Sequence, residues 1–297
     1  MGVNHARIYA DLRSCNLSAV YDRNPDAAQR VARKYRTYAA HSLEEFARLV
    51  DAATICTPTI THYEIGAYLL EQGKHLLIEK PVAETPTQAR ALSALAASRS
   101  CVLQVGHIER FNPVLAALEG KLNNPRFLEV TRLSPYPNRS TDIGVVLDLM
   151  IHDIDIILSM VPSGIKLVNS VGIPVLSEEV DIANARLQFE NGCVANVTAS
   201  RVSREAVRKI RIFQSDAYIS IDYQSRKISI FRKDDGGVPV PGLPNVSMEE
   251  KSFEQSDALL AEITAFIDSV RSGTAPVVTG EDGKRALELA LQINGKL

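Results

Sequence analysis

The first hundred residues of this chain alternate short apolar runs with stretches of helical pattern, and this alternation restricts the possible fold more than any other feature. The candidate strands are Leu17–Tyr21, Ala53–Cys56, His75–Ile78 and Val102–Val105. They are continuous apolar runs, as expected for parallel strands that helices cover on both faces. Ser42 with Glu45 has the spacing of a helix-capping box, and so does Thr85 with Gln88. The pattern predicts an α/β fold with a doubly wound parallel sheet.

After about residue 106 the pattern changes to one apolar helix, Val145–Met160, followed by longer strands with polar alternation. These strands are Ala183–Phe189, Cys193–Ser200, Lys209–Gln214, Tyr218–Asp222 and Lys227–Arg232, and two helices, Asp257–Arg271 and Glu281–Ile293, follow them. The sequence therefore predicts a second α+β domain with an open, largely antiparallel sheet. We place a dinucleotide-binding domain at 1–106 and a substrate-binding and oligomerisation domain at 107–297, whose terminal helices could return to the first domain.

The composition excludes several classes of protein. The 297 residues are 45% hydrophobic and 23% charged, with a formal net charge of -2, so we expect no nucleic-acid partner. The four cysteines, Cys15, Cys56, Cys101 and Cys193, include no C-x-x-C pair. We therefore expect no metal site and no disulfide framework, and reduced thiols fit a cytoplasmic protein. Charged residues interrupt the most apolar stretch, 144–161, and no signal-peptide pattern is present, so no membrane partner is expected.

The opening residues Met1–Ala6 look like the end of a G-x-G-x-x-G turn, which in Rossmann domains brings a helix N-terminus to the cofactor pyrophosphate. Gly2 would be its last glycine. Asp22 follows an apolar run about 20 residues later, where an acidic side chain would hold the ribose hydroxyls, although the same segment also reads as a simple turn. Arg23 could accept the 2′-phosphate of NADP, but Asp22 would repel it. NAD is therefore the expected cofactor and NADP stays possible.

This interpretation leaves one strand of the sheet unaccounted for. In a sheet of order 3-2-1-4-5-6, the first strand precedes the glycine-rich turn and lies between the second and fourth strands. If Gly2 ends that turn, the strand and two glycines are absent from this sequence. We then expect two facing strand edges with unpaired backbone groups, together with weakened binding of the pyrophosphate.

Four further motifs are specific in combination, each placed after a predicted strand or on the apolar helix. They are Cys56-Thr57-Pro58 with His62, Glu79-Lys80-Pro81, the run Gly106–Pro113 (G-H-I-E-R-F-N-P), and Asp148-x-x-x-His152-x-x-Asp155. In this order and spacing they resemble the Gfo/Idh/MocA family of oxidoreductases over essentially the whole chain. The resemblance implies a nicotinamide-dependent dehydrogenase that acts on a sugar or polyol.

The resemblance also implies roles for the residues of the first domain. Thr57 and Pro58 would line the nicotinamide side of the dinucleotide, and His62 would open the next helix near the phosphates or ribose. Glu79 would touch the nicotinamide ribose. Lys80 would be the catalytic lysine and would also contact the cofactor, although a lysine at a strand end is often only a solvated cap.

In the second domain, the resemblance implies that Arg110 and Asn112 bind the substrate and that Asp148 and His152 complete the catalytic group. Other roles remain open for these residues. Asp148 and His152 could be a satisfied polar pair in a buried helix, and Arg110 could form an interdomain ion pair. Asp155 is more often structural at such a position.

The chemistry has a physical basis that does not depend on the family. Oxidation of a secondary alcohol by hydride transfer requires a base within hydrogen-bond reach of the hydroxyl. A lysine beside a positive nicotinamide ring and partly removed from water loses its proton more readily, and its ammonium form stabilises an alkoxide. Asp148 and His152 are four residues apart, so on a helix they share one face, and the carboxylate can fix the imidazole tautomer.

The motifs around 105–113 and 146–155 most resemble the branch of the family that oxidises the C3 hydroxyl of UDP-N-acetylhexosamines. An inositol or free-sugar dehydrogenase is the alternative. An alternative of another class is a non-catalytic ligand-binding or regulatory relative. We also expect a homodimer or homotetramer, because Val194, Ala195, Val197 and Ala199 indicate a strand with apolar residues on both faces, which would leave a hydrophobic patch in water.

Overall fold

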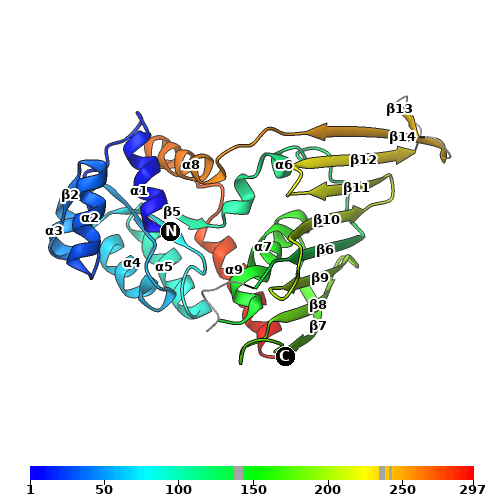
Figure 1. Cartoon of the computed structure of the whole chain (residues 1–297), viewed down its shortest axis with the longest axis horizontal. Helices are drawn as coiled ribbons and strands as arrows, with labels where there is room; N and C mark the ends of the chain where they lie inside the picture. Colours follow the sequence, from blue (N-terminus) through cyan, green and yellow to red (C-terminus); the bar gives the residue numbers. More distant parts are fainter. Residues whose placement is uncertain (137–142, 234–237, 241–242) are drawn as a thin grey trace. The chain divides into compact units, whose positions relative to one another are not determined.

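The computed structural model describes residues 1–136, 143–233, 238–240 and 243–297. The chain divides into two units, which Figure 1 colours by sequence. The first unit comprises Met1–Ile108 and Asp257–Arg285, and the second comprises Glu109–Ser256 and Ala286–Leu297.

The first unit alternates strands and helices, as the sequence pattern predicts. Its elements are α1 (Gly2–Asp11), β1 (Ala19–Val20), α2 (Pro25–Tyr35), β2 (Tyr38–Ala39), α3 (Leu43–Leu49), β3 (Ala52–Ile55), η1 (Thr59–Thr61), α4 (His62–Glu71), β4 (His75–Glu79), α5 (Pro86–Ser98), β5 (Leu103–Gly106), α8 (Ala258–Ser272) and the start of α9 (Gly280–Asn294). Both predicted helix starts are confirmed, because Ser42 accepts a hydrogen bond from the Glu45 amide and Thr85 forms a reciprocal capping box with Gln88.

The strands of the first unit form two separate parallel sheets. β1 pairs with β2, and β3, β4 and β5 pair in that order. In a doubly wound sheet of order 3-2-1-4-5-6, these strands occupy every position except the one between β1 and β3. The prediction of a Rossmann-type parallel fold is therefore confirmed, with its strands divided between two sheets among the described residues.

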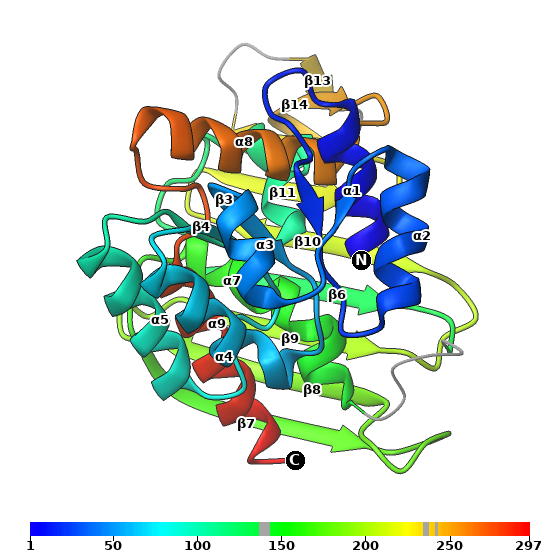
Figure 2. The same cartoon turned by 90° about the vertical axis from the view of Figure 1, so that its left-hand side faces the viewer.

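Helices cover both faces of the three-stranded sheet. On one face, α1 and α8 pack against β4 through a cluster that includes Ile8, Leu77 and Phe266. On the other face α4 and α5 lie side by side (Figure 2), where the Gly66 backbone comes so close that an added Cβ would lie 3.2 Å from Ile78. The buried apolar runs of the sequence thus face a helix layer on each side.

The second unit is built on one continuous sheet. Its elements are η2 (Ile108–Phe111), α6 (Pro113–Ala116), β6 (Phe127–Leu133), the π-helical η3 (Val146–Met150), α7 (Ile151–Met160), β7 (Ile165–Ile173), β8 (Ile182–Phe189), β9 (Val194–Ser200), β10 (Val207–Phe213), β11 (Ala217–Asp222), β12 (Lys227–Lys233), β13 (Val238–Val240), β14 (Leu243–Ser252) and most of α9. Among the described residues the strand order is β13-β14-β12-β11-β10-β6-β9-β8-β7, and every pairing except β6 with β9 is antiparallel. The predicted open, largely antiparallel sheet is confirmed, while β6, β7, β13 and β14 were not predicted.

The core of the second unit lies between the sheet and the helices α7 and α9 (Figure 1). Buried residues of α7, such as Ile154 and Ile157, pack with Ala290 and Ile293 of α9 and with the inner face of the sheet. Among the described residues, no helix is long and apolar enough to cross a membrane.

The outer face of this sheet differs from the expectation. Ala195, Val197 and Ala199 all lie on the buried face of β9, and its other face carries the half-buried Val194 with Asn196 and Thr198. The expectation that β9 is apolar on both faces was wrong, because its residues alternate strictly between core and surface. The outer face instead carries a ladder of aromatic rings on four neighbouring strands, with centroids 4.9 to 5.7 Å apart: Phe127, Phe213, Tyr218 and Phe231.

Candidate functional site

Polar motifs follow the carboxyl ends of β3, β4 and β5, which lie at one edge of the parallel sheet. Thr57 and Pro58 follow β3, Lys80 and Pro81 follow β4, and His107 follows β5. Ligands of open α/β sheets bind outside this edge. The structure thus brings three of the predicted cofactor residues, Thr57, Pro58 and Lys80, to the same edge of the sheet.

His62 connects two of these loops. It begins α4, as predicted, but its ring is buried, with Nδ1 2.8 Å from the Pro81 carbonyl oxygen and Nε2 2.8 Å from the Thr57 carbonyl oxygen. Both ring nitrogens therefore contact protein backbone. His62 fixes the loops that carry Thr57 and Lys80, whereas the sequence interpretation placed it near the cofactor phosphates or ribose.

Glu79 is held in place from two sides. Its Oε1 lies 2.8 Å from Nε2 of His5, and its Oε2 accepts a hydrogen bond from the Lys80 amide at 3.3 Å. A Cβ at Gly106 would lie 3.1 Å from the Glu79 Cα and the same distance from its carboxylate, so glycine is required there. This arrangement fixes the backbone from which Lys80, itself half-buried, projects. The contact with His5 was not predicted from the sequence.

His5, Glu79 and Cys56 also form the one group of described residues whose potential metal-ligand atoms lie within 4.8 Å of one another. Burial and the nearby Glu79 raise the pKa of the Cys56 thiol, which therefore stays protonated. A neutral thiol is a poor metal ligand, and the hydrogen bond between His5 and Glu79 accounts for their approach. We therefore assign no metal to this group, and the absence of a metal site stays a prediction.

The predicted ribose-binding residues lie where β1 ends. Asp22 is exposed and accepts a hydrogen bond from the Asn24 amide at 2.8 Å, so this segment does form a turn, with Asn24 capping α2. Asp22 and Arg23 also border a hollow of about 300 Å³ whose other walls include Ala39 and His41. A carboxylate beside a hollow of this size suits the adenosine end of a dinucleotide.

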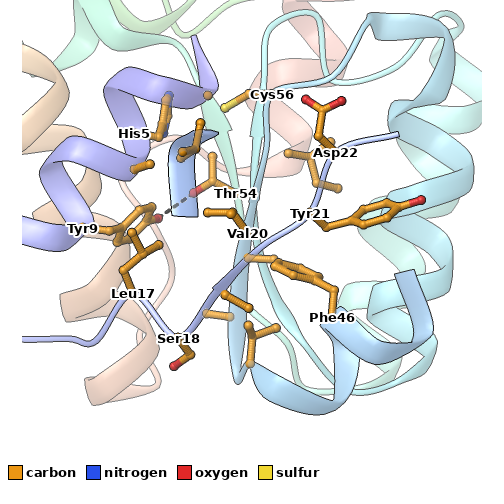
Figure 3. Close-up of a pocket in the computed structure, with 18 of the residues that line it drawn as sticks. His5, Tyr9, Leu17, Ser18, Val20, Tyr21, Asp22, Phe46, Thr54 and Cys56 are labelled. Atoms are coloured by element: carbon orange, nitrogen blue, oxygen red, sulfur yellow. Dashed lines mark hydrogen bonds between the residues drawn. The ribbon is translucent and has the colours of Figure 1, made fainter. Parts of the chain in front are cut away.

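A much larger cavity, of about 750 Å³, lies between β1 and β3 (Figure 3). Val20 of β1 and Thr54 of β3 border it, and α1 contributes His5 and Tyr9, whose hydroxyl lies 2.6 Å from the Thr54 hydroxyl. Gly2 also lines this cavity, and α1 begins at Gly2 as predicted.

Glu262 of α8 is a buried carboxylate that the sequence interpretation missed. It has no exposed surface, and neither carboxylate oxygen has a hydrogen-bond partner among the described residues. Burial and the proximity of Glu79 raise its pKa to about 9. The sequence did contain a signal for this burial. Glu262 stands three residues after Leu259 and four before Phe266, so it lies on the apolar stripe of the helix.

In the second unit, Asp148 and His152 lie at a junction between two kinds of helix. Asp148 is in the π-helical turn η3 and His152 is in the first turn of α7, so the single helix predicted over 145–160 is wrong at its start. π-helical turns are frequent at functional sites. Both side chains are half-buried.

Arg110 and Asn112 precede this helix in the chain, and each makes a contact within the second unit. The Arg110 Nε donates to Oδ2 of the buried Asp155 at 2.9 Å, and Asn112 caps α6 by accepting a hydrogen bond from the Val114 amide at 3.1 Å. The ion pair of Arg110 lies within the second unit, whereas the alternative interpretation placed it between domains.

Comparisons with known proteins agree with this arrangement. Residues 1–107 match the model of the oxidoreductase family with an NAD-binding Rossmann fold, and residues 116–220 match the GFO/IDH/MocA C-terminal domain. The UDP-N-acetylglucosamine 3-dehydrogenase of Acidithiobacillus ferrooxidans is 38% identical over 99% of this chain and 93% of its own length. An inositol 2-dehydrogenase of Rhizobium meliloti is 28% identical over 98% of this chain and 92% of its own length.

Solved structures give the same result. A structure of the Acidithiobacillus ferrooxidans UDP-N-acetylglucosamine 3-dehydrogenase superposes with a TM-score of 0.94 at 37% identity, and it covers all of this chain and 94% of its own. A levoglucosan dehydrogenase in complex with NADH and levoglucosan has a TM-score of 0.87 over 100% of this chain and 94% of its own, at 17% identity, and shows the shared fold. The chain belongs to the GFO/IDH/MocA family of NAD-binding oxidoreductases.

Proposed function

We propose that this protein oxidises the C3 hydroxyl of UDP-N-acetylglucosamine with NAD as the electron acceptor. The observation that carries the proposal is the full-length similarity to a UDP-N-acetylglucosamine 3-dehydrogenase, 38% identical over 99% of this chain. Similarity to inositol dehydrogenases is lower, at 28%. In the reaction, the C3–H bond and the hydroxyl O–H bond break, a carbonyl forms, and NAD, when bound, takes up the hydride.

The residues of the first unit suit the two ends of this cofactor. Asp22 would accept hydrogen bonds from the adenosine ribose beside its 300 Å³ hollow. Thr57 and Pro58 would line the nicotinamide end, and the amino end of α1 at Gly2 would face the pyrophosphate. Arg23 borders the same hollow as Asp22, but the Asp22 carboxylate favours NAD over a cofactor with a 2′-phosphate.

Lys80 is the proposed general base. It follows the sheet edge at which the cofactor residues gather, and Glu79, fixed by His5, sets the backbone before it. A neutral amine would take the hydroxyl proton as the hydride leaves, and the resulting ammonium would stabilise the developing negative charge on oxygen.

Asp148 and His152 are the proposed catalytic residues of the second unit. A carboxylate that holds one imidazole nitrogen fixes the tautomer of the ring and increases its basicity, which suits His152 to relay a proton. Arg110 is a proposed substrate-binding residue, and its ion pair with the buried Asp155 holds the guanidinium in one position. Asn112 would bind substrate only through groups that its capping bond leaves available.

The proposal includes an oligomeric state and a location in the cell. We infer a homodimer or homotetramer that covers the half-buried aromatic ladder of Phe127, Phe213, Tyr218 and Phe231, because aromatic side chains are enriched at protein interfaces. We infer a cytoplasmic location because the four cysteines are free thiols, which persist in reducing compartments.

The test is an assay of NAD reduction by the purified chain with UDP-N-acetylglucosamine, UDP-N-acetylgalactosamine and myo-inositol at equal concentrations. We expect the highest kcat/KM with UDP-N-acetylglucosamine and a 3-keto sugar as the product. A higher kcat/KM with myo-inositol would support the inositol-dehydrogenase alternative. Cofactor binding without turnover of any sugar would support the non-catalytic one.

A further inference from the structure

We propose that Arg132 is a positioning residue for the oxidation of the sugar, because it ties the short helix that carries Arg110 to the helix that carries His152. Through these links Arg132 sets the distance between the substrate-binding guanidinium and the imidazole. The inference deepens the proposed function and rests on it, since the roles of Arg110 and His152 come from there. All three residues belong to the second unit.

The Arg132 side chain joins two structural elements. It projects from β6 on the inner face of the sheet and is only 3% exposed. Its Nε and Nη2 donate to the two carboxylate oxygens of Asp153 in α7 at 2.7 and 2.9 Å, and its Nη1 donates to Oε1 of Glu109 in η2 at 3.0 Å. Since the guanidinium is a rigid plane with fixed donor directions, it holds the two carboxylates in one relative position.

Each of these carboxylates is next in the chain to a residue of the proposed site. Glu109 precedes Arg110, and Asp153 follows His152. Both stand inside the sequence motifs that predict the site, yet neither is among the residues proposed to contact the substrate. A shift of either carboxylate would therefore move Arg110 or His152.

A second link runs between the same two elements. Nε of Arg110 donates to Oδ2 of Asp155 at 2.9 Å, and Asp155 is 2% exposed. Successive residues of an α-helix are about 100° apart around its axis, so Asp153 and Asp155 lie on opposite sides of His152. The two links therefore restrain α7 on both sides of the imidazole, and the helix cannot rotate without breaking one of them.

Packing alone does not call for this network of charges. The side chains of Arg132 and Asp153 are each 4% exposed and that of Glu109 is 12% exposed, so all three have lost most of their water. A buried ion pair is often no more stabilising than apolar side chains of similar volume. Charged hydrogen bonds instead add direction, because they fix the angle as well as the distance between two groups. The network therefore suits a role in geometry.

A neighbouring arginine provides a matched control. Arg208 of β10 lies opposite Arg132 in the strand register and donates to the same Oε1 of Glu109 at 3.4 Å, but its side chain is 51% exposed. An exposed pair of this kind contributes little to structure. Arg208→Gln should therefore leave kcat and KM near those of the parent, whereas substitutions in the buried link should not.

The experiment measures kcat and KM for UDP-N-acetylglucosamine in Arg132→Lys, which keeps the positive charge and loses the planar fork of donors. A misplacement of about 1 Å can lower a rate about a hundredfold, so we expect kcat/KM to fall at least about tenfold. The dissociation constant of NAD should stay unchanged, because the proposed cofactor residues lie in the first unit.

A second variant keeps the proposal falsifiable if Arg132→Lys fails to fold. Glu109→Gln retains an oxygen that can accept the hydrogen bond from Arg132, but it removes the charge that strengthens this bond. We expect kcat/KM to fall at least about threefold in this variant, with the same unchanged binding of NAD.

Repeating both substitutions in Arg110→Ala separates positioning from stability. If Arg132 and Glu109 act through Arg110, each loss in kcat/KM should shrink at least about threefold in this background, because groups that act as a unit are not additive. A purely structural role would lower the thermal midpoint and leave kcat/KM of the folded variants unchanged. That result, or losses that multiply in the double variants, would overturn the proposal.

The parent chain tests the proposed function separately. Turnover of UDP-N-acetylgalactosamine or myo-inositol in place of UDP-N-acetylglucosamine would contradict the proposed substrate, and the ratios of variant to parent would then test Arg132 with the sugar that is oxidised. A parent that binds NAD and oxidises none of the three would contradict the proposed function and the positioning role with it. Normal turnover by the parent together with unchanged variants would contradict the positioning role alone.

Discussion

The two units of this protein differ in how completely they pair their sheets. In the second unit, β10, β6 and β9 each pair on both sides, and inward residues such as Ile212, Val130 and Val197 are fully or almost fully buried. In the first unit, β1 and β3 border a cavity of about 750 Å³. The difference teaches that the second unit buries its core against one continuous sheet, while the parallel strands of the first unit are divided between two sheets with a cavity between them.

The largest expected effect is on activity and concerns a residue of the first unit. Lys80→Met should lower kcat by at least about a hundredfold, because general acid–base groups contribute about 10² to 10⁴. Since the side chain is half-buried at a turn, NAD binding by calorimetry and the unfolding midpoint should stay near those of the parent. Near-normal turnover would remove Lys80 from the mechanism.

The next largest effect is on the stability of the second unit. Arg132 donates to both carboxylate oxygens of the buried Asp153, at 2.7 and 2.9 Å. Asp153→Ala should destabilise the second unit by about 3 kcal/mol, because the buried Arg132 guanidinium loses both bonds to Asp153 and keeps the one to Glu109 at 3.0 Å. The matched control is Glu129→Ala, which removes an exposed pair with Arg211 and should cost at most about 1 kcal/mol. Equal losses in urea unfolding of the two variants would contradict the burial argument.

The stability of the first unit should depend on pH in a way that the stability of the second unit does not. Glu262 has a pKa of about 9 in the folded chain, well above the ordinary carboxyl value, so between these two values the folded state holds a proton that the unfolded state has lost. The free energy of unfolding of the first unit should therefore fall as pH rises from about 5 to 8, by up to about 1.4 kcal/mol per pH unit.

Glu262→Gln should remove this slope, while Glu71→Gln, at an exposed position of α4, should keep it. The measurement is hydrogen exchange or urea unfolding of the first unit across that pH range. An unchanged slope in Glu262→Gln would show that the buried carboxyl does not titrate as described. The second unit should show neither effect.

Much of the first unit could be predicted from the sequence because its signals are local. The apolar runs of β3, β4 and β5 need only neighbouring residues to be recognised, and the capping boxes at Ser42 and Thr85 are formed within one turn.

Elements that depend on distant partners were missed. In β6 the inward positions are Leu128, Val130 and Arg132. The arginine interrupts the apolar alternation of the sequence. It can be buried because it pairs with Asp153, 21 residues away. The edge strand β7 has several exposed residues and so lacks a clear apolar face.

At the site, the position of Lys80 was predictable from the strand before it. The contact of His5 with Glu79 was not, since 74 residues separate them and the contact depends on how α1 packs.

The central claim is the proposed hydride transfer from C3 of UDP-N-acetylglucosamine, and deuterium at that carbon tests it most directly. The purified chain would be incubated with NAD and substrate deuterated at C3, and the reduced cofactor analysed by mass spectrometry. We predict that the reduced cofactor carries one deuterium and that turnover slows relative to unlabelled substrate. Reduced cofactor without deuterium, or no reduced cofactor under conditions where NAD binds, would contradict the proposed reaction.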